Sequence, residues 1–262
     1  HAGVLTPRRL RVPDVRLSPP GWPAELDGLR VAVVGDLHAG APWVDLARVR
    51  AVVLAVLAAT PDLVLLMGDP LGRPVSAAEL AGALAGLCAA APVVGVLGNH
   101  DWYAGGHRVR AALEDAGLPV LEESAVPVLG GRLWVAGVGD LWERSPDVDA
   151  ALSGVPEGAP VVLLTHNPDV VADVPAHVQL VLAGHTHGGQ IALSPTFSPA
   201  RLITRYTMGQ FREGRAQLYV HRGMGTVGAV PLRLGSSGVG SSTLPVRNVV
   251  PEVPVLVLST GC

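Results

Sequence analysis

Residues 31–38 read Val-Ala-Val-Val-Gly-Asp-Leu-His, a short apolar run that ends in side chains able to bind a metal. A continuous apolar run, without polar alternation, is typical of a strand buried on both faces of a sheet. The pattern recurs along the chain, and the later runs end at Asp69, Asn99, His166 and His185. These runs therefore predict the strands of the fold and place potential metal ligands at the ends of the strands.

Segments with apolar residues at helical spacing separate these strands. They cover residues 43–59, 76–90 and 107–116. Ser76 and Glu79 form a capping box at the start of the second segment, and Gly117 closes the third. Strands that alternate with helices predict an α/β fold whose helices cover the sheet faces. The number of strands favours a layered β-sandwich flanked by helices, with further strands expected at 133–138, 217–221 and 255–258.

The chain of 262 residues is long enough for one large domain or two small ones. Because the polar strand ends spread from Asp36 to His187 and resemble parts of one site, we expect a single domain over residues 29–262. An Arg- and Pro-rich stretch over residues 1–28 is expected to be an extended lead-in. No apolar run of membrane-spanning length lacks a charge or a proline. Since the sequence begins at His1 rather than Met, we expect missing upstream residues, which would be the place for an export signal or a membrane anchor.

The composition excludes several classes of function. All 19 basic residues are Arg, so the chain has no Lys for a phosphate-binding P-loop or for a Schiff base. A net charge of −3 argues against a broad nucleic-acid surface, because such binding depends on neutralising many phosphates. The two cysteines, Cys88 and Cys262, do not form the pattern of a disulfide framework.

The residues at the strand ends form a candidate metal site. In an α/β sheet the carboxyl ends of the strands face a crevice where ligands bind. We expect eight side chains to meet there: Asp36, His38, Asp69, Asn99, His100, His166, His185 and His187. Carboxylate, amide and imidazole groups suit divalent ions of the Mn, Fe and Zn class, and so many of them suit two ions that share a carboxylate. Each piece alone has a structural explanation, such as a Gly-Asp turn or a buried histidine, but the whole set favours the metal site.

The strand-end residues belong to five short motifs, which are Gly35-Asp36-Leu37-His38, Gly68-Asp69, Gly98-Asn99-His100-Asp101, Thr165-His166-Asn167-Pro168-Asp169 and Gly184-His185-Thr186-His187-Gly188-Gly189-Gln190. In order and spacing, these motifs resemble those of the calcineurin-like metallophosphoesterases. The resemblance covers roughly residues 9–258. The Asn-Pro-Asp and Gly-Gly-Gln extensions are similar to a branch of bacterial phosphoesterases that are membrane-anchored or exported by a twin-arginine signal. The resemblance implies an α/β/β/α sandwich and a hydrolase with two divalent cations.

The resemblance also implies a role for each site residue. One metal would be held by Asp36, His38 and His187 and the other by Asn99, His166 and His185, with Asp69 and a hydroxide bridging the two. His100 would face the substrate and donate a proton to the leaving group, and Asp101 would orient or tune His100. The metals would activate the hydroxide and stabilise the charge on the phosphoryl oxygens.

One departure from the family pattern follows Asp69, where Pro70 removes a backbone N–H and stiffens the turn. We therefore expect a reshaped loop on the substrate side. Substrate contacts are expected from Arg73, Trp102, Tyr103 and Arg108, with packing or a surface position as the alternative. Trp142 and Arg144 have the same two interpretations. His221 ends a strand-like run but belongs to no motif, and we expect it to be structural.

The leading hypothesis is a two-metal hydrolase of phosphate mono- or diesters, whose substrate is a small molecule or a lipid-like ester of the cell envelope. A cyclic-nucleotide or pyrophosphate phosphodiesterase is an alternative within the enzyme class. Outside that class, the alternatives are a scaffold of the same fold that binds metal without catalysis and a metal-storage or sensing module. The full set of ligands, together with the histidine of Asn-His-Asp, favours the enzyme.

Overall fold

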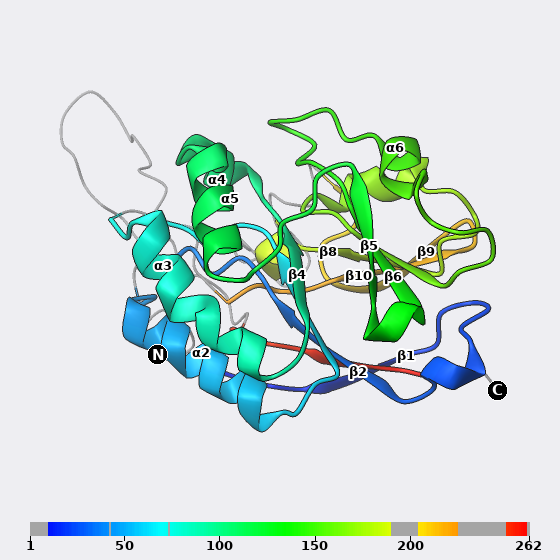
Figure 1. Ribbon diagram of the computed structural model, residues 1–262, viewed down its shortest axis with the longest axis horizontal. Helices are drawn as coiled ribbons and strands as arrows, with labels where there is room; N and C mark the ends of the chain where they lie inside the picture. Colours follow the sequence, from blue (N-terminus) through cyan, green and yellow to red (C-terminus); the bar gives the residue numbers. More distant parts are fainter. Residues whose placement is uncertain (1–9, 42, 73, 190–203, 225–249, 261–262) are drawn as a thin grey trace.

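The computed structural model describes residues 10–41, 43–72, 74–189, 204–224 and 250–260. Two β-sheets pack against each other, and helices cover their outer faces (Figure 1). This arrangement is the helix-flanked sandwich that the sequence predicts. Among the described residues, no helix is both long enough and apolar enough to cross a lipid bilayer.

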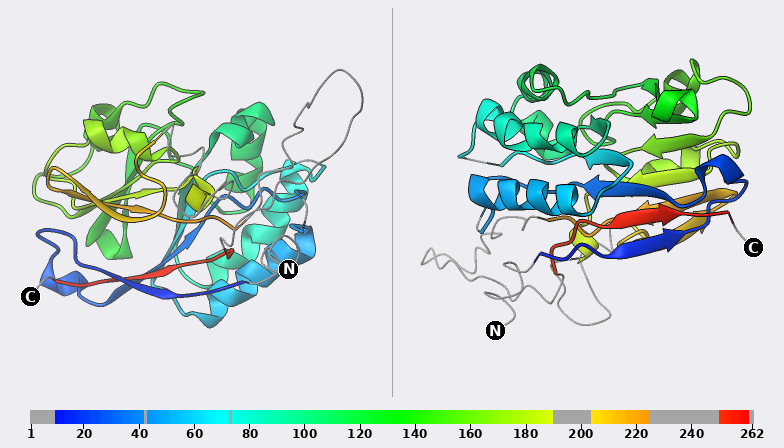
Figure 2. Two further views of the ribbon diagram at one scale, coloured as in Figure 1. Left: turned by 180° about the vertical axis from the view of Figure 1, so that it is seen from behind. Right: turned by 60° about the horizontal axis from the view of Figure 1, so that its bottom comes forward.

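The first sheet has the strand order β1-β11-β2-β3-β4. Its strands are β1 (Asp14–Leu17), β2 (Leu29–Val34), β3 (Leu63–Met67), β4 (Val93–Val96) and β11 (Val255–Leu258). Strands β2, β3 and β4 run parallel, so their carboxyl ends share one edge. Strand β11 lies between β1 and β2, parallel to the first and antiparallel to the second (Figure 2).

The second sheet has the strand order β5-β6-β7-β8-β10-β9. Its strands are β5 (Ser124–Val128), β6 (Leu133–Gly137), β7 (Val161–Leu164), β8 (Leu180–Ala183), β9 (Gly209–Glu213) and β10 (Ala216–Val220). The four inner strands are parallel, whereas β5 and β9 are antiparallel edges. The inner strands therefore also present their carboxyl ends together.

Helices cover the outer faces of the two sheets. The α-helices are α2 (Leu46–Ala58), α3 (Ala77–Leu84), α4 (Asn99–Tyr103), α5 (Gly106–Asp115) and α6 (Val148–Leu152). The short 3-10 helices are η1 (Ala24–Leu26), η2 (Ala85–Ala89), η3 (Leu129–Gly131), η4 (Pro168–Asp173) and η5 (His187–Gly189). Apolar residues of α2, α3 and α5 pack on the first sheet, and those of α6 and η4 pack on the second.

Strand β2 shows why the apolar runs are continuous. Val31 and Val33 point into the core between the two sheets, whereas Ala32 and Val34 point into the core beneath the helices. Burying one Val side chain stabilises the fold by about 2 kcal/mol relative to leaving it exposed, so both faces of the strand favour apolar residues. Because the strand separates the core between the sheets from the core beneath the helices, the polar residues that follow it lie at the rim of both cores.

The predicted helices are present, and Ser76 and Glu79 form the expected capping box of α3. The expected lead-in over residues 1–28 is more than a lead-in, because Asp14–Leu17 form the edge strand β1. Edge strands carry charged residues and only partial burial, so the run Asp-Val-Arg-Leu gives little strand signal. For the same reason the sequence did not indicate β9, and Pro127 concealed the edge strand β5.

Candidate metal centre

The backbone at the strand ends takes an uncommon conformation. Asp36, His38, Asp69, His185 and His187 all have positive φ, between 47° and 69°. Such a conformation is unfavourable for a residue with a side chain, and it persists where the surrounding structure requires it. Concentration of this strain at the expected ligands indicates that the loops are built to aim these side chains at one place.

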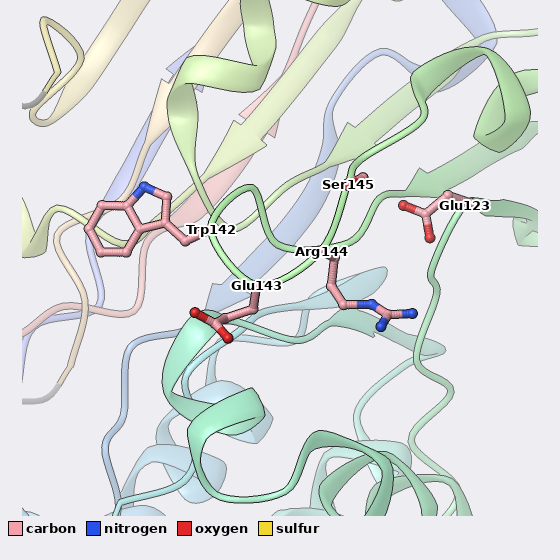
Figure 3. A pocket seen from close by; sticks show the side chains of 5 residues that line it. All are labelled: Glu123, Trp142, Glu143, Arg144 and Ser145. Carbon is pink, nitrogen blue, oxygen red and sulfur yellow. The ribbon is translucent and has the colours of Figure 1, made fainter.

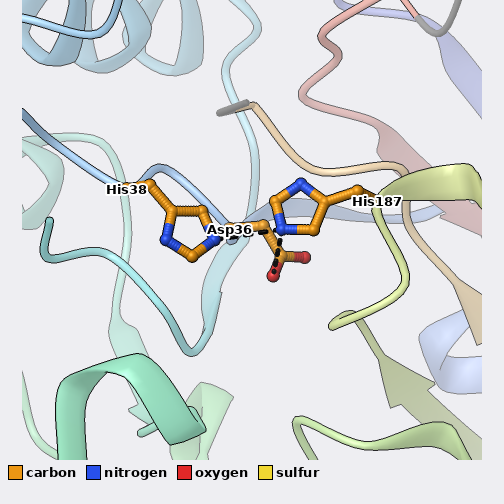
Figure 4. A group of neighbouring side chains, drawn as sticks. All are labelled: Asp36, His38 and His187. Carbon is orange, nitrogen blue, oxygen red and sulfur yellow. Dashed lines mark hydrogen bonds and ion pairs between the residues drawn. The ribbon is translucent and has the colours of Figure 1, made fainter. Parts of the chain in front are cut away.

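Asp36, His38 and His187 form the first group of ligand atoms, named here the Asp36 cluster. One ligand atom from each lies within 4.8 Å of the other two, and all three side chains are buried. His38 Nε2 is 3.0 Å from His187 Nε2, which is 3.6 Å from Asp36 Oδ1 (Figure 4). Asp36 and His38 follow β2, and His187 follows β8, so the two sheets meet in this cluster.

Asn99, His166 and His185 form the second group, named the His166 cluster. His185 Nδ1 lies 3.1 Å from Asn99 Oδ1 and 3.2 Å from His166 Nε2. His166 and Asn99 are buried, and His185 is partly exposed. Strands β4, β7 and β8 deliver these three residues.

Asp69 joins the two clusters. Its Oδ2 lies 3.7 Å from His38 Nε2 in the first cluster and 3.2 Å from His166 Nε2 in the second. Its Oδ1 accepts the backbone N–H of His100 at 2.9 Å. One buried carboxylate therefore faces both sets of ligand atoms.

The hydrogen bonds of His166 show that these atoms suit a cation. His166 Nδ1 lies 2.9 Å from the carbonyl oxygen of Met67, which only accepts, so Nδ1 carries a proton and Nε2 is the nitrogen that offers a lone pair when the ring is neutral. That lone pair faces Asp69 Oδ2 and the neighbouring ring of His185. Acceptor atoms that face one another repel unless a proton or a cation lies between them. Imidazole, carboxylate and amide donors in this arrangement fit divalent ions of the Mn, Fe and Zn class.

The pKa values of the ligands reflect their burial and their mutual charges. Burial lowers the pKa of His38 to about 4 and that of His185 to about 3, so both rings are neutral at pH 7. Burial also acts to lower the pKa of His166, but the charge and hydrogen bond of Asp69 and the charge of Asp36 outweigh it and raise the pKa to about 10. Burial raises the pKa of Asp36 to about 7. In the absence of a cation, protons on His166 and Asp36 balance part of the buried negative charge.

His100 lies on the open side of the centre. Its ring is partly exposed, and one of its nitrogens lies within 4.8 Å of ligand atoms of His38 and Asp69. The ring makes an edge contact with the ring of His38 at 4.8 Å between centroids. Its position, beside the ligands and open to solvent, is suited to meeting a bound substrate.

Asp101 has a different role from the one that we expected. Its buried carboxylate accepts the backbone N–H groups of Asp69 at 2.9 Å, Gly98 at 3.0 Å and Leu71 at 3.3 Å. These bonds tie the loop after β3 to the start of α4. Asp101 therefore fixes the backbone that carries Asp69 and Asn99, and the prediction that it orients the ring of His100 is corrected.

The four residues expected to contact substrate have separate positions. Tyr103 is 56% exposed and packs its ring edge against His100 at 5.5 Å. Trp102 is partly buried, and the guanidinium carbon of Arg144 lies 4.6 Å from the centroid of its ring. Arg108 donates to the carbonyl of Ala104 at 3.4 Å and lines a cavity of about 280 Å³ beside Leu71. Arg73 lies outside the described residues, as does Gln190 of the last motif.

Trp142 is a neighbour of the centre that no motif marked. Its ring makes an edge contact with His185 at 4.2 Å between centroids, and the side chain is 48% exposed. It also lines a cavity of about 500 Å³ whose other lining residues are Glu123, Glu143, Arg144 and Ser145 (Figure 3). In the sequence, this Trp follows a strand and a Gly-Asp pair. That position is equally compatible with a residue at the rim of the metal centre and with a residue that only packs against its neighbours.

His221 is the second neighbour that the sequence did not place. It is 1% exposed, and its Nε2 lies 3.4 Å from Asp36 Oδ2. Burial lowers its pKa to about 3, so the ring is neutral. Its position directly after β10, like that of the ligands after their strands, was the signal that could have found it.

Comparisons with known proteins agree with this geometry. The model of the calcineurin-like phosphoesterase family matches residues 29–189. The metallophosphoesterase YkuE of Bacillus subtilis is 29% identical over 248 residues, which cover 89% of this chain and 84% of that protein. The phosphodiesterase YaeI of Escherichia coli is 29% identical over 213 residues, 76% of each chain.

The solved structure of the protein TT1561 of Thermus thermophilus shares the fold, with a TM-score of 0.51 and 17% identity over 75% of this chain and 90% of that chain. The match to the family model begins at β2 and extends through His187, and so includes every expected metal ligand. The chain therefore belongs to the calcineurin-like phosphoesterase family and is a metal-dependent hydrolase of phosphate esters.

Proposed function

We propose that the chain hydrolyses phosphodiesters at two divalent cations, held by the Asp36 cluster and the His166 cluster, with His100 as the general acid. The observation that carries this proposal is the position of Asp69 Oδ2, 3.7 Å from His38 Nε2 and 3.2 Å from His166 Nε2. A carboxylate shared in this way suits two neighbouring cations that act on one phosphoryl group. Diesters come first because the relative YaeI is named a phosphodiesterase. Small-molecule and lipid-like diesters are both candidate substrates.

The cations, when bound, supply a hydroxide nucleophile near neutral pH and offset the negative charge of the phosphoryl oxygens. The chain holds the ligands for them in fixed positions. Asp36 and Asp69 are at most 1% exposed, and the backbone N–H of His185 donates to Asp36 Oδ2 at 3.1 Å. Fixed, buried ligands need no rearrangement during the reaction, which is the basis of electrostatic catalysis.

His100 supplies the proton that the leaving oxygen needs. Its ring lies at the open side of the centre, within reach of a phosphoryl group placed next to Asp69 and His38. The bond from its backbone N–H to Asp69 Oδ1 fixes the start of α4 against the shared ligand. General-acid catalysis of this kind typically contributes about 10²–10⁴ in rate.

A panel of esters tests the proposal. The chain loaded with Mn²⁺ is assayed on nitrophenyl and alkyl diesters, the matching monoesters, a cyclic nucleotide, a pyrophosphate and a lysophospholipid. We expect His100→Ala to keep its metal content and to lose about 10²–10⁴ in turnover of the alkyl diester. The loss on the nitrophenyl diester should be smaller, because nitrophenolate leaves without a proton. His177→Ala, at an exposed histidine, is the matched control.

Different outcomes reject different parts of the proposal. A metal-loaded chain that hydrolyses no ester would be a metal-binding scaffold. Equal losses on the alkyl and nitrophenyl diesters would remove the general-acid role from His100. Faster turnover of monoesters, cyclic nucleotides or pyrophosphates would replace the phosphodiester assignment.

A further inference from the structure

His221 is a buried histidine beside the metal centre and outside its ligand set. It follows β10, which runs parallel to β8, so it reaches the same edge of the second sheet as His185. Its backbone N–H donates to the carbonyl of Ala183 at 2.9 Å, and its side chain is 1% exposed. The strand therefore delivers this ring to the back of the Asp36 cluster.

Two glycines leave the space that the ring occupies. A Cβ on Gly35 would lie 2.6 Å from His221 Nε2, and a Cβ on Gly184 would overlap both that nitrogen and Asp36 Oδ2. Gly35 follows β2 in one sheet, and Gly184 follows β8 in the other. The imidazole thus lies between the two ligand loops, with its Nε2 end turned toward Asp36.

The hydrogen bonds of the ring fix where its proton lies. The backbone N–H of Gly223 donates to His221 Nδ1 at 2.9 Å, so Nδ1 is the unprotonated nitrogen of the neutral ring. The proton is then on Nε2, which lies 3.4 Å from Asp36 Oδ2 and has no hydrogen-bond partner among the residues that the structure describes. A buried donor without an acceptor is destabilising, and Asp36 is the carboxylate in front of it.

We propose that His221 is a positioning residue whose Nε2–H holds Asp36 Oδ2, so that Asp36 Oδ1 faces His38, His187 and the cation of this cluster. The backbone N–H of His185 is shared by both oxygens, at 3.1 Å from Oδ2 and 3.3 Å from Oδ1, and Oδ1 also lies 3.6 Å from His187 Nε2. The two oxygens thus differ in their neighbouring imidazoles, because Oδ2 faces His221 and Oδ1 faces the expected ligand His187. This inference rests on the proposed function, since it assumes a cation at the Asp36 cluster.

The competing interpretation is that His221 only fills space and accepts the N–H of Gly223. Two substitutions separate the interpretations. His221→Gln carries an amide N–H near the position of Nε2 and keeps a donor toward Asp36. His221→Asn keeps an acceptor near the position of Nδ1 for Gly223, but its amide is too short to reach Asp36. His221→Leu removes both groups at similar volume, and His177→Gln is the control at an exposed histidine.

The measurement is Mn²⁺ affinity of the whole chain, by competition with a chelator, without any substrate. Loss of a hydrogen bond behind a metal ligand typically weakens metal binding by about 10–100-fold, and we expect that loss at one site in His221→Leu and His221→Asn. His221→Gln should restore most of the affinity. The absorption spectrum of the Co²⁺-loaded chain should change in the Leu and Asn variants, because the ligand geometry changes. Urea unfolding of each variant without metal checks that it is folded.

Equal Mn²⁺ affinity in the wild type, His221→Leu and His221→Asn would overturn the proposal. So would rescue by Asn rather than by Gln, which would assign His221 to packing. If His221→Leu does not fold, the comparison of Gln with Asn still decides. A wild-type chain that binds no Mn²⁺ would overturn the metal centre and the proposed function as well. If the wild type binds Mn²⁺ and hydrolyses esters, and His221→Leu has the same Mn²⁺ affinity, only the role of His221 is refuted.

Discussion

The Asp36 cluster and the His166 cluster share Asp69, but they hold their protons on different groups. In the Asp36 cluster burial lowers the pKa of His38 to about 4 and raises that of Asp36 to about 7, so the carboxyl group carries the proton. In the His166 cluster the nearby carboxylates raise the pKa of His166 to about 10, so an imidazole carries it. The two halves of one centre should therefore respond differently to pH and to substitution.

The substitution Asp69→Asn removes what the two clusters share, and it should have the largest effect. The amide keeps the size of the side chain but loses the negative charge that faces His38 and His166. We expect loss of at least one bound cation per chain and a fall in turnover of about a thousandfold, the scale seen when one strong electrostatic group leaves an active site. Elemental analysis of the purified variant checks the first result. An unchanged metal content would mean that Asp69 does not connect the clusters.

The pH dependence of metal binding sharpens the comparison. A cation must displace the proton of His166 below pH 10 and that of Asp36 below pH 7, because a ligand has to be deprotonated to bind. Affinity at the His166 cluster should thus rise about tenfold per pH unit up to about pH 10, while affinity at the Asp36 cluster should level off above about pH 7. Mn²⁺ titrations at several pH values, with proton release measured by calorimetry in different buffers, check this. Parallel pH profiles for the two sites would contradict the difference.

The substitution Asp101→Asn tests whether Asp101 stabilises the backbone that carries Asp69 and Asn99, next to the His166 cluster. Its amide NH₂ would face backbone N–H groups that now donate to the carboxylate, those of Gly98, Asp69 and Leu71. We expect the free energy of unfolding to fall by about 2–3 kcal/mol, because hydrogen bonds are lost and buried N–H donors are left unpaired. Urea unfolding measures it. Wild-type stability in this variant would show that the three contacts add nothing.

The aromatic residues at the rim should have the smallest effects. Tyr103 packs against His100, and Trp142 packs against His185, so each flanks a different side of the centre. We expect Tyr103→Ala or Trp142→Ala to raise KM by about two- to tenfold at unchanged metal content, the range of an aromatic contact of about 0.5–1.5 kcal/mol. Steady-state kinetics with metal analysis checks both variants. A loss of bound metal in Trp142→Ala would instead make this ring a support of His185.

The positions of the expected ligands could be predicted from sequence because each of them follows a strand buried on both faces. Parallel strands bring their carboxyl ends to one edge, so the runs before Asp36, Asp69 and Asn99 already place these three residues together. The helices and the two-layered sandwich follow from the same alternation of patterns. Edge strands such as β1 were missed, because partial burial leaves them little apolar signal.

The roles of Asp101 and His221 could not be predicted, for two physical reasons. Asp101 is next to His100 in α4, and adjacent residues of a helix point in different directions, so sequence proximity does not imply contact. His221 depends on contacts between two sheets and on the space left by Gly35 and Gly184, which no local pattern records. Side-chain direction within the loops, rather than the choice of ligands, was the missing information.

The strand order β1-β11-β2 has a consequence for how the molecule matures. Residues 255–258 insert between two strands that are made much earlier along the chain, so β2 lacks this neighbour until residues 255–258 have been made. Contacts so distant along the chain form slowly, because a long loop must close first. The strand that precedes Asp36 therefore keeps an open edge until residues 255–258 have emerged, and a nascent chain should acquire its cations only after these residues have left the exit tunnel.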